Sequence, residues 1–134
     1  MKVFFDTNVL ISAFITRGLC NEIVEDIIAR YQLLTGELVI DEFERVLTRK
    51  FNFDKDLIDL TIEYIRTFDI APTPIDHLPF EGLDEMDALI LTSAVHAKAD
   101  LFVTGDSDFL SLQKETHGIK TLSPRELWKM LKLI

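Results

Sequence analysis

Cysteine is almost absent from the sequence, and this excludes two kinds of site. The 134 residues include a single cysteine, Cys20, so the chain has no internal disulfide and no cysteine-based zinc site. The three histidines, at positions 77, 96 and 117, are dispersed and lack the spacing of zinc ligands. No glycine-rich phosphate-binding loop of the GxxxxGKS/T or GxGxxG type occurs, and no GxSxG serine motif. The sequence therefore favours neither nucleotide binding nor serine hydrolysis.

Long apolar runs are missing as well. The apolar stretches, such as residues 89–91, fall far short of the roughly 20 residues that span a membrane. The N-terminal segment MKVFFDTNVL has an early aspartate and lacks the apolar core and cleavage site of a secretory signal. We therefore expect a cytoplasmic protein with no membrane contact. Because no repeat, low-complexity segment or linker interrupts the chain, residues 1–134 are predicted to form one domain.

Basic residues are scarce relative to acidic ones. The chain has 14 Lys and Arg against 23 Asp and Glu, a net charge of −9. This balance argues against a broad electrostatic attraction to nucleic acid, which normally needs clustered Lys and Arg. It does not exclude a nucleic-acid substrate, because bound divalent cations would reverse the local charge. An acidic domain is also suited to binding a small basic protein.

What the chain does contain is an alternation of short apolar segments and amphipathic helices. The pattern predicts strands at residues 2–5, 32–36, 69–76, 101–104 and 119–122, and helices within 6–15, 20–31, 39–51, 54–68, 84–99 and 123–134. The 69–76 segment is expected to be an edge strand that breaks into a loop at its prolines. Because the strands are mainly apolar rather than alternating, and lie between helices, they indicate a parallel sheet with helices on both faces, an α/β fold.

Acidic residues follow two of the predicted strands directly. Asp6 comes after the first strand, and Asp106 follows the 101–104 strand by one glycine. In a parallel sheet the carboxyl ends of the strands share one edge, where ligands gather. Asp84 and Asp87 begin the 84–99 helix, three residues apart and therefore on one face. These acids are therefore candidates for one site.

A further acid comes from the 39–51 helix, which carries three of them near its start. Glu42 lies one turn before Val46 and so borders the apolar face of the helix. Its neighbours Asp41 and Glu44 are expected to be more solvated. Periodicity alone leaves open which of the three turns inward.

Taken singly, each acid has a simpler explanation as a helix cap, a turn residue or a surface charge. Taken together, these explanations are insufficient, because four acids on one edge raise one another's pKa unless a cation lies among them. A site with oxygen ligands alone suits a hard cation, Mg²⁺ or Mn²⁺. Such a cation usually positions water and polarises a phosphoryl group.

Four stretches of the sequence carry a resemblance to a known family: VFFDTNVLISA (3–13), DEFERVL (41–47), DEMDALILTSAVHAKADLFVTGDSDFL (84–110) and IKTLSPRELW (119–128). They closely resemble the PIN domain, above all its VapC-like branch, the toxins of bacterial and archaeal toxin–antitoxin pairs. The resemblance extends over nearly the whole chain. It implies a three-layer α/β/α sandwich around a central parallel sheet of four to five strands.

The resemblance also implies roles for individual residues. Asp6, Glu42, Asp87 and Asp106 match the four acids that hold one or two Mg²⁺ or Mn²⁺ ions and are the catalytic residues. Asn8 and Thr104 match the small polar residues that hold these carboxylates in place. Asp108 is either an additional metal ligand or a turn residue, and Asp84 lies at the margin of the site.

The function implied by the resemblance is endoribonuclease activity on single-stranded RNA. Metal ions on the acids would lower the pKa of a water molecule that attacks the phosphodiester. Arg17, Arg45, Arg49 and Lys50 are candidates for contacting the RNA, or are ordinary surface charges. By resemblance the chain is the toxin of a type II toxin–antitoxin pair, forms a homodimer and is blocked by a small antitoxin protein.

Two other functions fit parts of the sequence. The first is a PIN-fold protein-binding module with little or no nuclease activity, although all four acid positions are occupied. The second is a receiver-like phosphoacceptor domain, which also has acids at strand ends. A receiver needs a lysine after a late strand, whereas Lys120 precedes Thr121 and Leu122 within the strand. The sequence therefore favours the nuclease.

Overall fold

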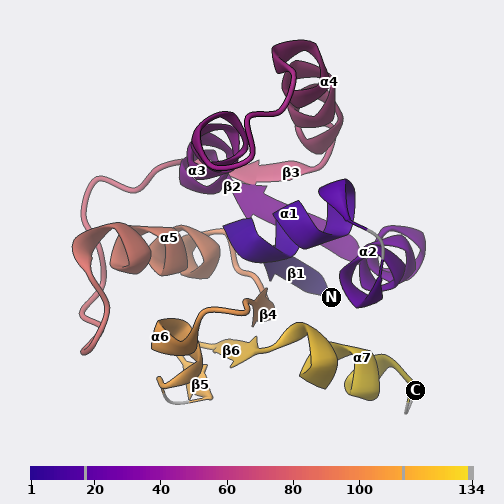
Figure 1. The fold of residues 1–134 in the computed structure, drawn as a ribbon. Helices are drawn as coiled ribbons and strands as arrows, with labels where there is room; N and C mark the ends of the chain where they lie inside the picture. Colours follow the sequence, from indigo (N-terminus) through magenta and orange to yellow (C-terminus); the bar gives the residue numbers. More distant parts are fainter. Residues whose placement is uncertain (17, 113, 133–134) are drawn as a thin grey trace.

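The sheet at the centre of the molecule has β1 in its middle. The computed structural model describes residues 1–16, 18–112 and 114–132 (Figure 1). Within these ranges the strands are β1 (Lys2–Phe5), β2 (Gln32–Gly36), β3 (Asp69–Ala71), β4 (Leu101–Val103), β5 (Glu115–Thr116) and β6 (Ile119–Leu122). Their order is β3-β2-β1-β4-β6-β5, and every neighbouring pair is parallel except β5 with β6. The α/β fold with a mostly parallel sheet is confirmed.

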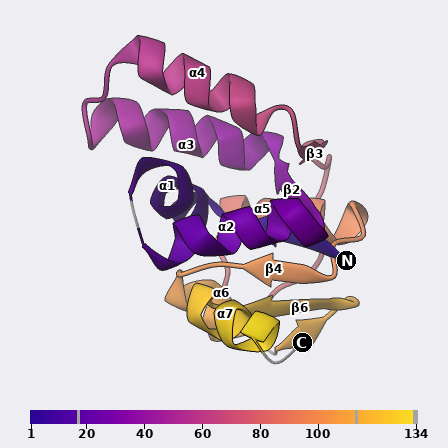
Figure 2. The same ribbon diagram turned by 90° about the vertical axis from the view of Figure 1, so that its right-hand side faces the viewer.

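Helices cover both faces of this sheet. They are α1 (Thr7–Ile15), α2 (Leu19–Arg30), α3 (Glu37–Arg49), α4 (Lys55–Ile65), α5 (Glu85–His96), α6 (Ser107–Leu110) and α7 (Pro124–Lys132). In Figure 2, α2 and α7 lie in front of the sheet and α5 lies behind it, while α3 and α4 pair at the β3 side. Of the helices described, none is long and apolar enough to cross a membrane.

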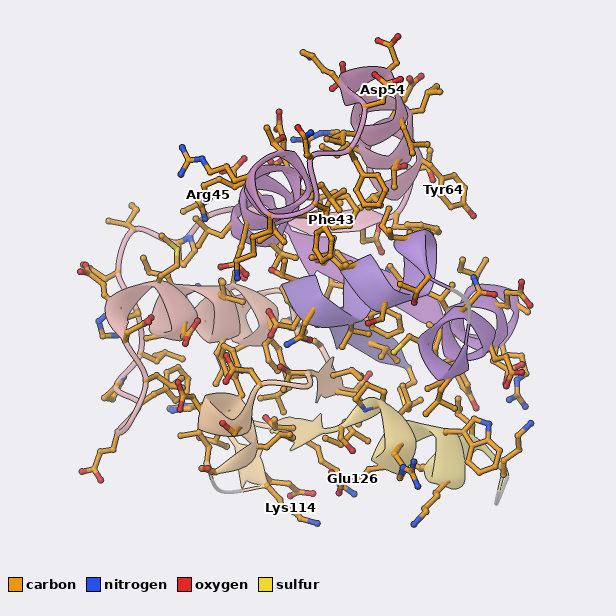
Figure 3. The ribbon with its side chains drawn as sticks, in the orientation of Figure 1. Phe43, Arg45, Asp54, Tyr64, Lys114 and Glu126 are labelled. Atoms are coloured by element: carbon orange, nitrogen blue, oxygen red, sulfur yellow. The ribbon has the colours of Figure 1, made fainter. Side chains whose placement is uncertain are left out.

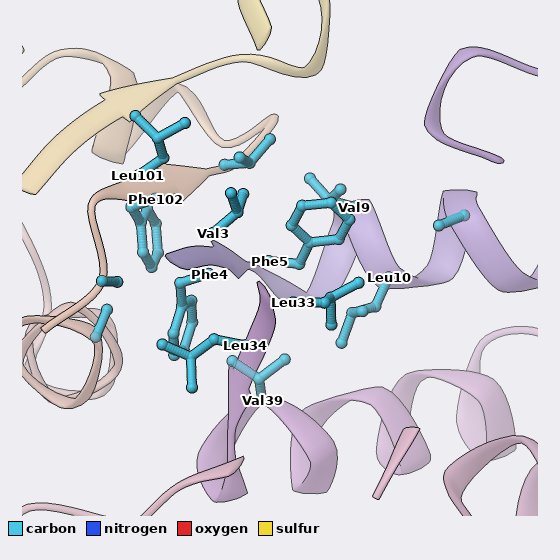
Figure 4. Close-up of a cluster of buried hydrophobic side chains, with 14 of the residues drawn as sticks. Val3, Phe4, Phe5, Val9, Leu10, Leu33, Leu34, Val39, Leu101 and Phe102 are labelled. Atoms are coloured by element: carbon cyan, nitrogen blue, oxygen red, sulfur yellow. The ribbon is translucent and has the colours of Figure 1, made fainter. Parts of the chain in front are cut away.

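The apolar strands are buried on both sides, as their composition predicts. Val3, Phe4 and Phe5 of β1 have no exposed surface. The Phe4 and Phe102 rings stack with centroids 5.3 Å apart, and Phe102 lies 4.9 Å from Phe109. Figure 4 shows these β1 side chains between residues of β2, β4 and α1. Each such buried side chain stabilises the fold by roughly 2 kcal/mol, so the central strands are rigidly placed.

Of two predictions at the sheet edges, one is confirmed and one was wrong. The edge strand that was expected to break into a loop at its prolines ends at Ala71, because Pro72 has no N–H to donate to the ladder. The sheet has six strands in the described residues, not four or five, because β5 pairs with β6 through a two-residue turn. His117 and Gly118 form this turn with φ of 51° and 80°. Two residues of strand are too short for a hydrophobic pattern to reveal.

The register of the central strands brings their carboxyl ends into line. Phe5 of β1 pairs with Val103 of β4, and Val103 pairs with Leu122 of β6. The hydrogen bonds continue one residue further: Asp6 N donates to Val103 O at 3.0 Å, and Thr104 N donates to Leu122 O at 3.1 Å. The strand order reverses between β1 and β4, the place where parallel α/β sheets bind ligands.

Candidate active site

Asp6 is a buried carboxylate at the carboxyl end of β1. Only 4% of its surface is exposed, and its Oδ2 accepts a hydrogen bond of 2.7 Å from the Thr104 hydroxyl. The backbone N–H of Thr7 also donates to it. Asp6 stands at the N-cap position of α1 but makes no capping hydrogen bond with its side chain. Helix capping therefore does not explain this aspartate.

The loop after β4 is tied to the end of β1 by two hydrogen bonds. The buried Thr104 hydroxyl, which donates to Asp6, also accepts from Asp106 N at 3.0 Å. The Asn8 side-chain oxygen accepts from Gly105 N at 3.1 Å. In turn, Asp106 Oδ1 accepts from Asp108 N at 2.9 Å and caps the short helix α6. Thr104 thus contacts the carboxylate, whereas Asn8 positions the loop backbone.

Three acids come closest to one another at this edge. Asp87, Asp106 and Asp108 each offer a carboxylate oxygen, and these oxygens lie within 4.8 Å of one another. Asp87 and Asp106 are half-buried and Asp108 is exposed. Asp84 caps α5 by accepting from Asp87 N at 2.8 Å, which accounts for its place beside the group.

Two pKa values are raised at this edge, by burial first and by neighbouring carboxylates second. Burial raises the pKa of Asp6 to about 6, the Thr104 and Thr7 hydrogen bonds oppose this rise, and the charges of Glu42 and Asp106 add to it. The pKa of Asp87 is also raised to about 6, first by burial and then by the neighbouring carboxylates, Asp84 foremost. The charges that raise these two pKa values belong to Asp6, Glu42, Asp84 and Asp106. None of these acids forms an ion pair with a basic residue in the described part of the chain.

The other predicted residues lie around this group. Glu42 is half-buried on α3, while Asp41 and Glu44 are exposed. The charge of Glu42 contributes to the raised pKa of both Asp6 and Asp87, but Glu42 is outside the group of three close carboxylates. Among the basic candidates, Arg45 and Arg49 line one surface hollow together with Asp41, Glu44 and Thr48. Lys50 is exposed at the end of α3, and Arg17 lies outside the described residues.

The donor set at this edge fits a divalent cation. Carboxylate oxygens are the preferred ligands of hard cations, and the group of close side chains consists of carboxylates alone. A cation among them would supply the missing positive charge and lower the raised pKa values. Mg²⁺ and Mn²⁺ both suit such a set.

One contribution escaped the sequence reasoning. The Thr7 N–H donates to Asp6, yet nothing in the sequence marks it, because every residue except proline carries this donor. For Asp108 the sequence allows two roles, turn residue or metal ligand. Its backbone N–H donates to Asp106, and its carboxylate lies among the three close carboxylates.

Comparison with known proteins identifies the family. A family model described as the PIN domain matches residues 2–108. The chain belongs to the PIN domain family. No curated protein matches the sequence.

Solved structures with the same fold include several from toxin–antitoxin systems. This PIN domain superposes on VapBC2 from Rickettsia felis, bound to a DNA fragment from its promoter, with a TM-score of 0.67 at 13% identity over 92% of this chain and 98% of that one. A toxin–antitoxin complex from Klebsiella pneumoniae gives 0.65 at 22% identity, over 91% and 97%. VapC20 from Mycobacterium tuberculosis, a toxin that cleaves the sarcin–ricin loop, gives 0.54 at 12% identity, over 88% and 98%. At these identities the likeness shows a shared fold.

Proposed function

We propose that this PIN domain is a metal-dependent endoribonuclease that hydrolyses phosphodiester bonds of single-stranded RNA. The observation that carries the proposal is the crowding of carboxylates, with oxygens of Asp87, Asp106 and Asp108 within 4.8 Å and no basic partner in the described chain. Burial, together with the neighbouring carboxylates, raises the pKa of Asp6 and Asp87 to about 6, and a cation would relieve this accumulation of negative charge. These carboxylates lie at the edge where a parallel α/β sheet binds its ligand.

The proposed catalytic residues are Asp6, Glu42, Asp87 and Asp106, which would hold one or two ions with Asp108 as an additional ligand. A bound Mg²⁺ or Mn²⁺ would lower the pKa of a water molecule and stabilise negative charge on the phosphate oxygens. Thr104 keeps the Asp6 carboxylate oriented through the 2.7 Å bond, and Asn8 holds the loop that carries Asp106. Both contacts fix the ligands before the substrate arrives.

The biological role that fits is the toxin of a type II toxin–antitoxin pair, in the cytoplasm. Support comes from the fold shared with the Rickettsia felis and Klebsiella pneumoniae proteins, which come from toxin–antitoxin complexes. The proposed partners are a small antitoxin protein and a second copy of this chain. Co-purification with the product of a neighbouring gene, followed by measurement of the mass of the complex, tests both partners.

The test of the nuclease compares two aspartates at opposite ends of β4. Asp106→Asn removes a carboxylate from the close group and is expected to lower RNA cleavage by about 10²-fold or more. Asp100→Asn is the matched control, because its carboxylate is exposed and accepts a 2.7 Å bond from Lys2 N instead. Cleavage of a labelled single-stranded RNA is measured with Mg²⁺, with Mn²⁺ and with a chelator.

Three outcomes would count against the nuclease. They are cleavage that persists with the chelator, equal loss in both variants, and no cleavage by the wild type under any of these conditions. The last result, combined with binding of an antitoxin, would favour the protein-binding module.

A further inference from the structure

A hollow of about 360 Å³ lies between two segments of the chain that both lead to the acids. Its lining residues come from the segment before α5 and from the segment after α6: Pro79, Phe80, Glu81, Ser111, Leu112 and Thr116. In Figure 1 the segment between β3 and α5 reaches down beside α6. A volume of this size is in the range of small-molecule binding sites, roughly 300–1,000 Å³. The proposed nuclease mechanism leaves this hollow without a role.

The end of the hollow at α6 adjoins the acids. Ser111 N and Ser111 Oγ both donate to Ser107 O, at 2.9 and 2.7 Å, so Ser111 continues the turn of α6. Ser111 follows Asp108 by three residues, and residues three apart on a helix share one face with Cβ atoms roughly 5–6 Å apart. Asp108 is one of the three close carboxylates. A ligand beside Ser111 therefore lies next to the acids, while Thr116 lines the hollow further along the chain, in β5.

The opposite wall of the hollow leads to the acids as well. Glu81 precedes Asp84, the N-cap of α5, by three residues, a stretch that spans at most roughly 11 Å. Gly82 has a φ of 86°, in the left-handed region that favours glycine, and turns the chain from this wall toward α5. Leu78 N donates to the buried Thr92 hydroxyl of α5 at 2.9 Å. This bond holds the wall in place before any ligand arrives.

The lining of the hollow suits an uncharged aromatic ring. Phe80 is half-buried, and its ring meets the His117 ring edge to face with centroids 5.4 Å apart, which ties the two walls together. Ser111, Thr116 and Glu81 add side chains that form hydrogen bonds. Proteins bind the bases of single-stranded RNA by stacking them on aromatic side chains and by hydrogen bonds to their edges. The hollow offers both kinds of contact.

The same lining does not suit a phosphate group. Among the described residues that line the hollow, Glu81 is the charged one, and its carboxylate repels an anion. Lys114, the basic residue of segment 111–116, lies 3.4 Å from Glu126 and forms an ion pair with it (Figure 3). A nucleotide would therefore enter the hollow with its neutral base and leave its phosphate at the acids.

A second hollow adjoins the acids but offers a base less. It has about 170 Å³ and is lined by Asn8, Val9, Ser12, Cys20, Gly105 and Pro124. None of these described residues is aromatic, and the Asn8 side-chain oxygen already accepts from Gly105 N. Stacking of a base therefore favours the larger hollow.

We propose that the hollow between residues 79–81 and 111–116 receives the base of a nucleotide next to the bond that is cleaved. Phe80 stacks on the base, and the Glu81 carboxylate accepts a hydrogen bond from an amino group of the base. Adenine, cytosine and guanine carry such an amino group, whereas uracil does not. This proposal rests on the proposed nuclease function and adds to it a preference for these three bases at one position of the RNA.

The first measurement is RNA binding, in an Asp106→Asn background that suppresses cleavage. Fluorescent oligocytidylate and oligouridylate are compared by anisotropy with Mg²⁺, because the two bases share a pyrimidine ring and differ in the amino group. Oligocytidylate should bind on the order of 10-fold more tightly. Glu81→Gln should remove most of this preference, and Phe80→Leu should weaken the binding of both oligomers on the order of 10-fold.

Phe51→Leu and Glu85→Gln are the matched controls. Phe51 is also a partly exposed phenylalanine, but it follows α3, and Glu85 is exposed in the first turn of α5 without lining the hollow. Glu85→Gln removes the same charge as Glu81→Gln, so it separates a lost hydrogen bond from weaker repulsion of the RNA. Both controls should keep the preference for oligocytidylate. Thermal unfolding of each variant verifies that the fold is intact.

The second measurement is the sequence preference of cleavage by proteins with Asp106 in place. Single-stranded RNA with a randomised segment is cleaved with Mg²⁺, and the ends of the products are sequenced. At one fixed position near the cut, the wild type should favour A, C or G over U on the order of 10-fold, and Glu81→Gln should reduce this preference. Phe80→Leu should lower kcat/KM on the order of 10-fold.

The outcomes separate the hollow from the nuclease. If the wild type cleaves RNA and both Phe80→Leu and Glu81→Gln behave like their controls, the role of the hollow is overturned while the nuclease stands. A Glu81-dependent preference for oligocytidylate, without any cleavage by the wild type, would refute the nuclease and keep the hollow as a base-binding site.

Two further results would overturn the role of the hollow. One is the absence of any difference between the two oligomers in the Asp106→Asn protein, whether both bind or neither does. The other is a Phe80→Leu protein that loses binding of an antitoxin and keeps its RNA binding, because the hollow would then receive a side chain of the partner protein.

Discussion

The amino ends and the carboxyl ends of β1 and β4 differ in the surroundings of their carboxylates. At the amino ends, the Asp100 carboxylate accepts a 2.7 Å bond from Lys2 N, and the Lys2 ammonium group donates to Ala97 O at 3.4 Å. At the carboxyl ends, Asp6 and Asp106 join Asp87 with no basic group among the charges that shift the pKa values. The same pair of strands thus ends in one exposed, hydrogen-bonded carboxylate on one side and in crowded, partly buried carboxylates on the other.

This difference shows that the crowding is not a requirement of the fold. Both ends flank the same apolar core, yet at the amino ends the aspartate, Asp100, is exposed. The pKa of Asp6 rises from 3.8 to about 6, so its ionised form costs roughly 3 kcal/mol of folding free energy near neutral pH. A cost of this size at one edge is typical of a site whose residues serve binding or catalysis.

The largest expected effect comes from removing the Asp6 charge. Asp6→Asn should lower the rate of RNA cleavage by about 10³-fold or more, because a proposed metal ligand is lost. In the metal-free protein at pH 8, the same change should raise the free energy of unfolding by up to about 3 kcal/mol, because it removes a buried charge. Urea denaturation with chelator and initial rates with Mg²⁺ measure both. A variant that is less stable and fully active would contradict the contrast between the two ends.

The second-largest expected effect is a pH dependence of folding stability that comes from the carboxyl ends of the strands. In the metal-free protein, folded Asp6 holds its proton up to about pH 6, whereas the unfolded chain releases it near 3.8. Stability contributed by Asp6 is therefore present at low pH and falls as the pH rises through this window, by roughly 3 kcal/mol. Asp87 acts in the same direction.

This effect is best measured as a difference between proteins. Wild type and Asp6→Asn should have similar stability near pH 4 and diverge toward pH 7, with the variant more stable. Addition of Mg²⁺ should narrow the gap by stabilising only the wild type. A gap that is constant with pH would mean that the Asp6 pKa is ordinary in the folded protein.

The smallest of these effects concerns two buried threonines, Thr104 directly after β4 and Thr121 in the neighbouring strand β6. Thr104 donates to Asp6, whereas the hydroxyl of Thr121 on β6 is buried without a hydrogen-bond partner in the described residues. Thr104→Val should lower cleavage on the order of 10-fold, because Asp6 loses its orienting donor. It should also move the acidic limb of the pH–rate profile upward, because the lost hydrogen bond had lowered the pKa of Asp6.

Thr121→Val is the matched control for this change. This substitution changes a threonine that is also buried, but it removes a hydroxyl without a hydrogen-bond partner in the described residues. The cleavage rate and its pH profile should therefore match the wild type, and the free energy of unfolding should be unchanged or higher. If both valine variants lose the same activity, the Thr104 hydroxyl has no particular role.

Local pattern was sufficient for the scaffold of the site. The run Val3–Phe5 has no polar alternation, which predicts a strand buried on both faces, and the helices between such strands imply a parallel sheet. From that topology, Asp6 and Asp106 had to share the carboxyl edge. The helix expected within 123–134 likewise forms as α7, whose start is capped by two hydrogen bonds between Ser123 and Glu126.

Tertiary packing decided which acids actually meet. The sequence brought no reason to prefer Asp108, since its approach to Asp87 depends on how the single turn of α6 sits against the first turn of α5. A periodic sequence pattern also cannot reveal the two-residue strand β5 or the Thr7 contact to Asp6. Nor can it reveal the raised pKa values of Asp6 and Asp87, because burial and the distances between carboxylates arise only when the elements pack. The sequence pattern thus determined which acids lie at the carboxyl edge of the sheet. Tertiary packing determined their burial and the distances between them, and therefore their pKa values.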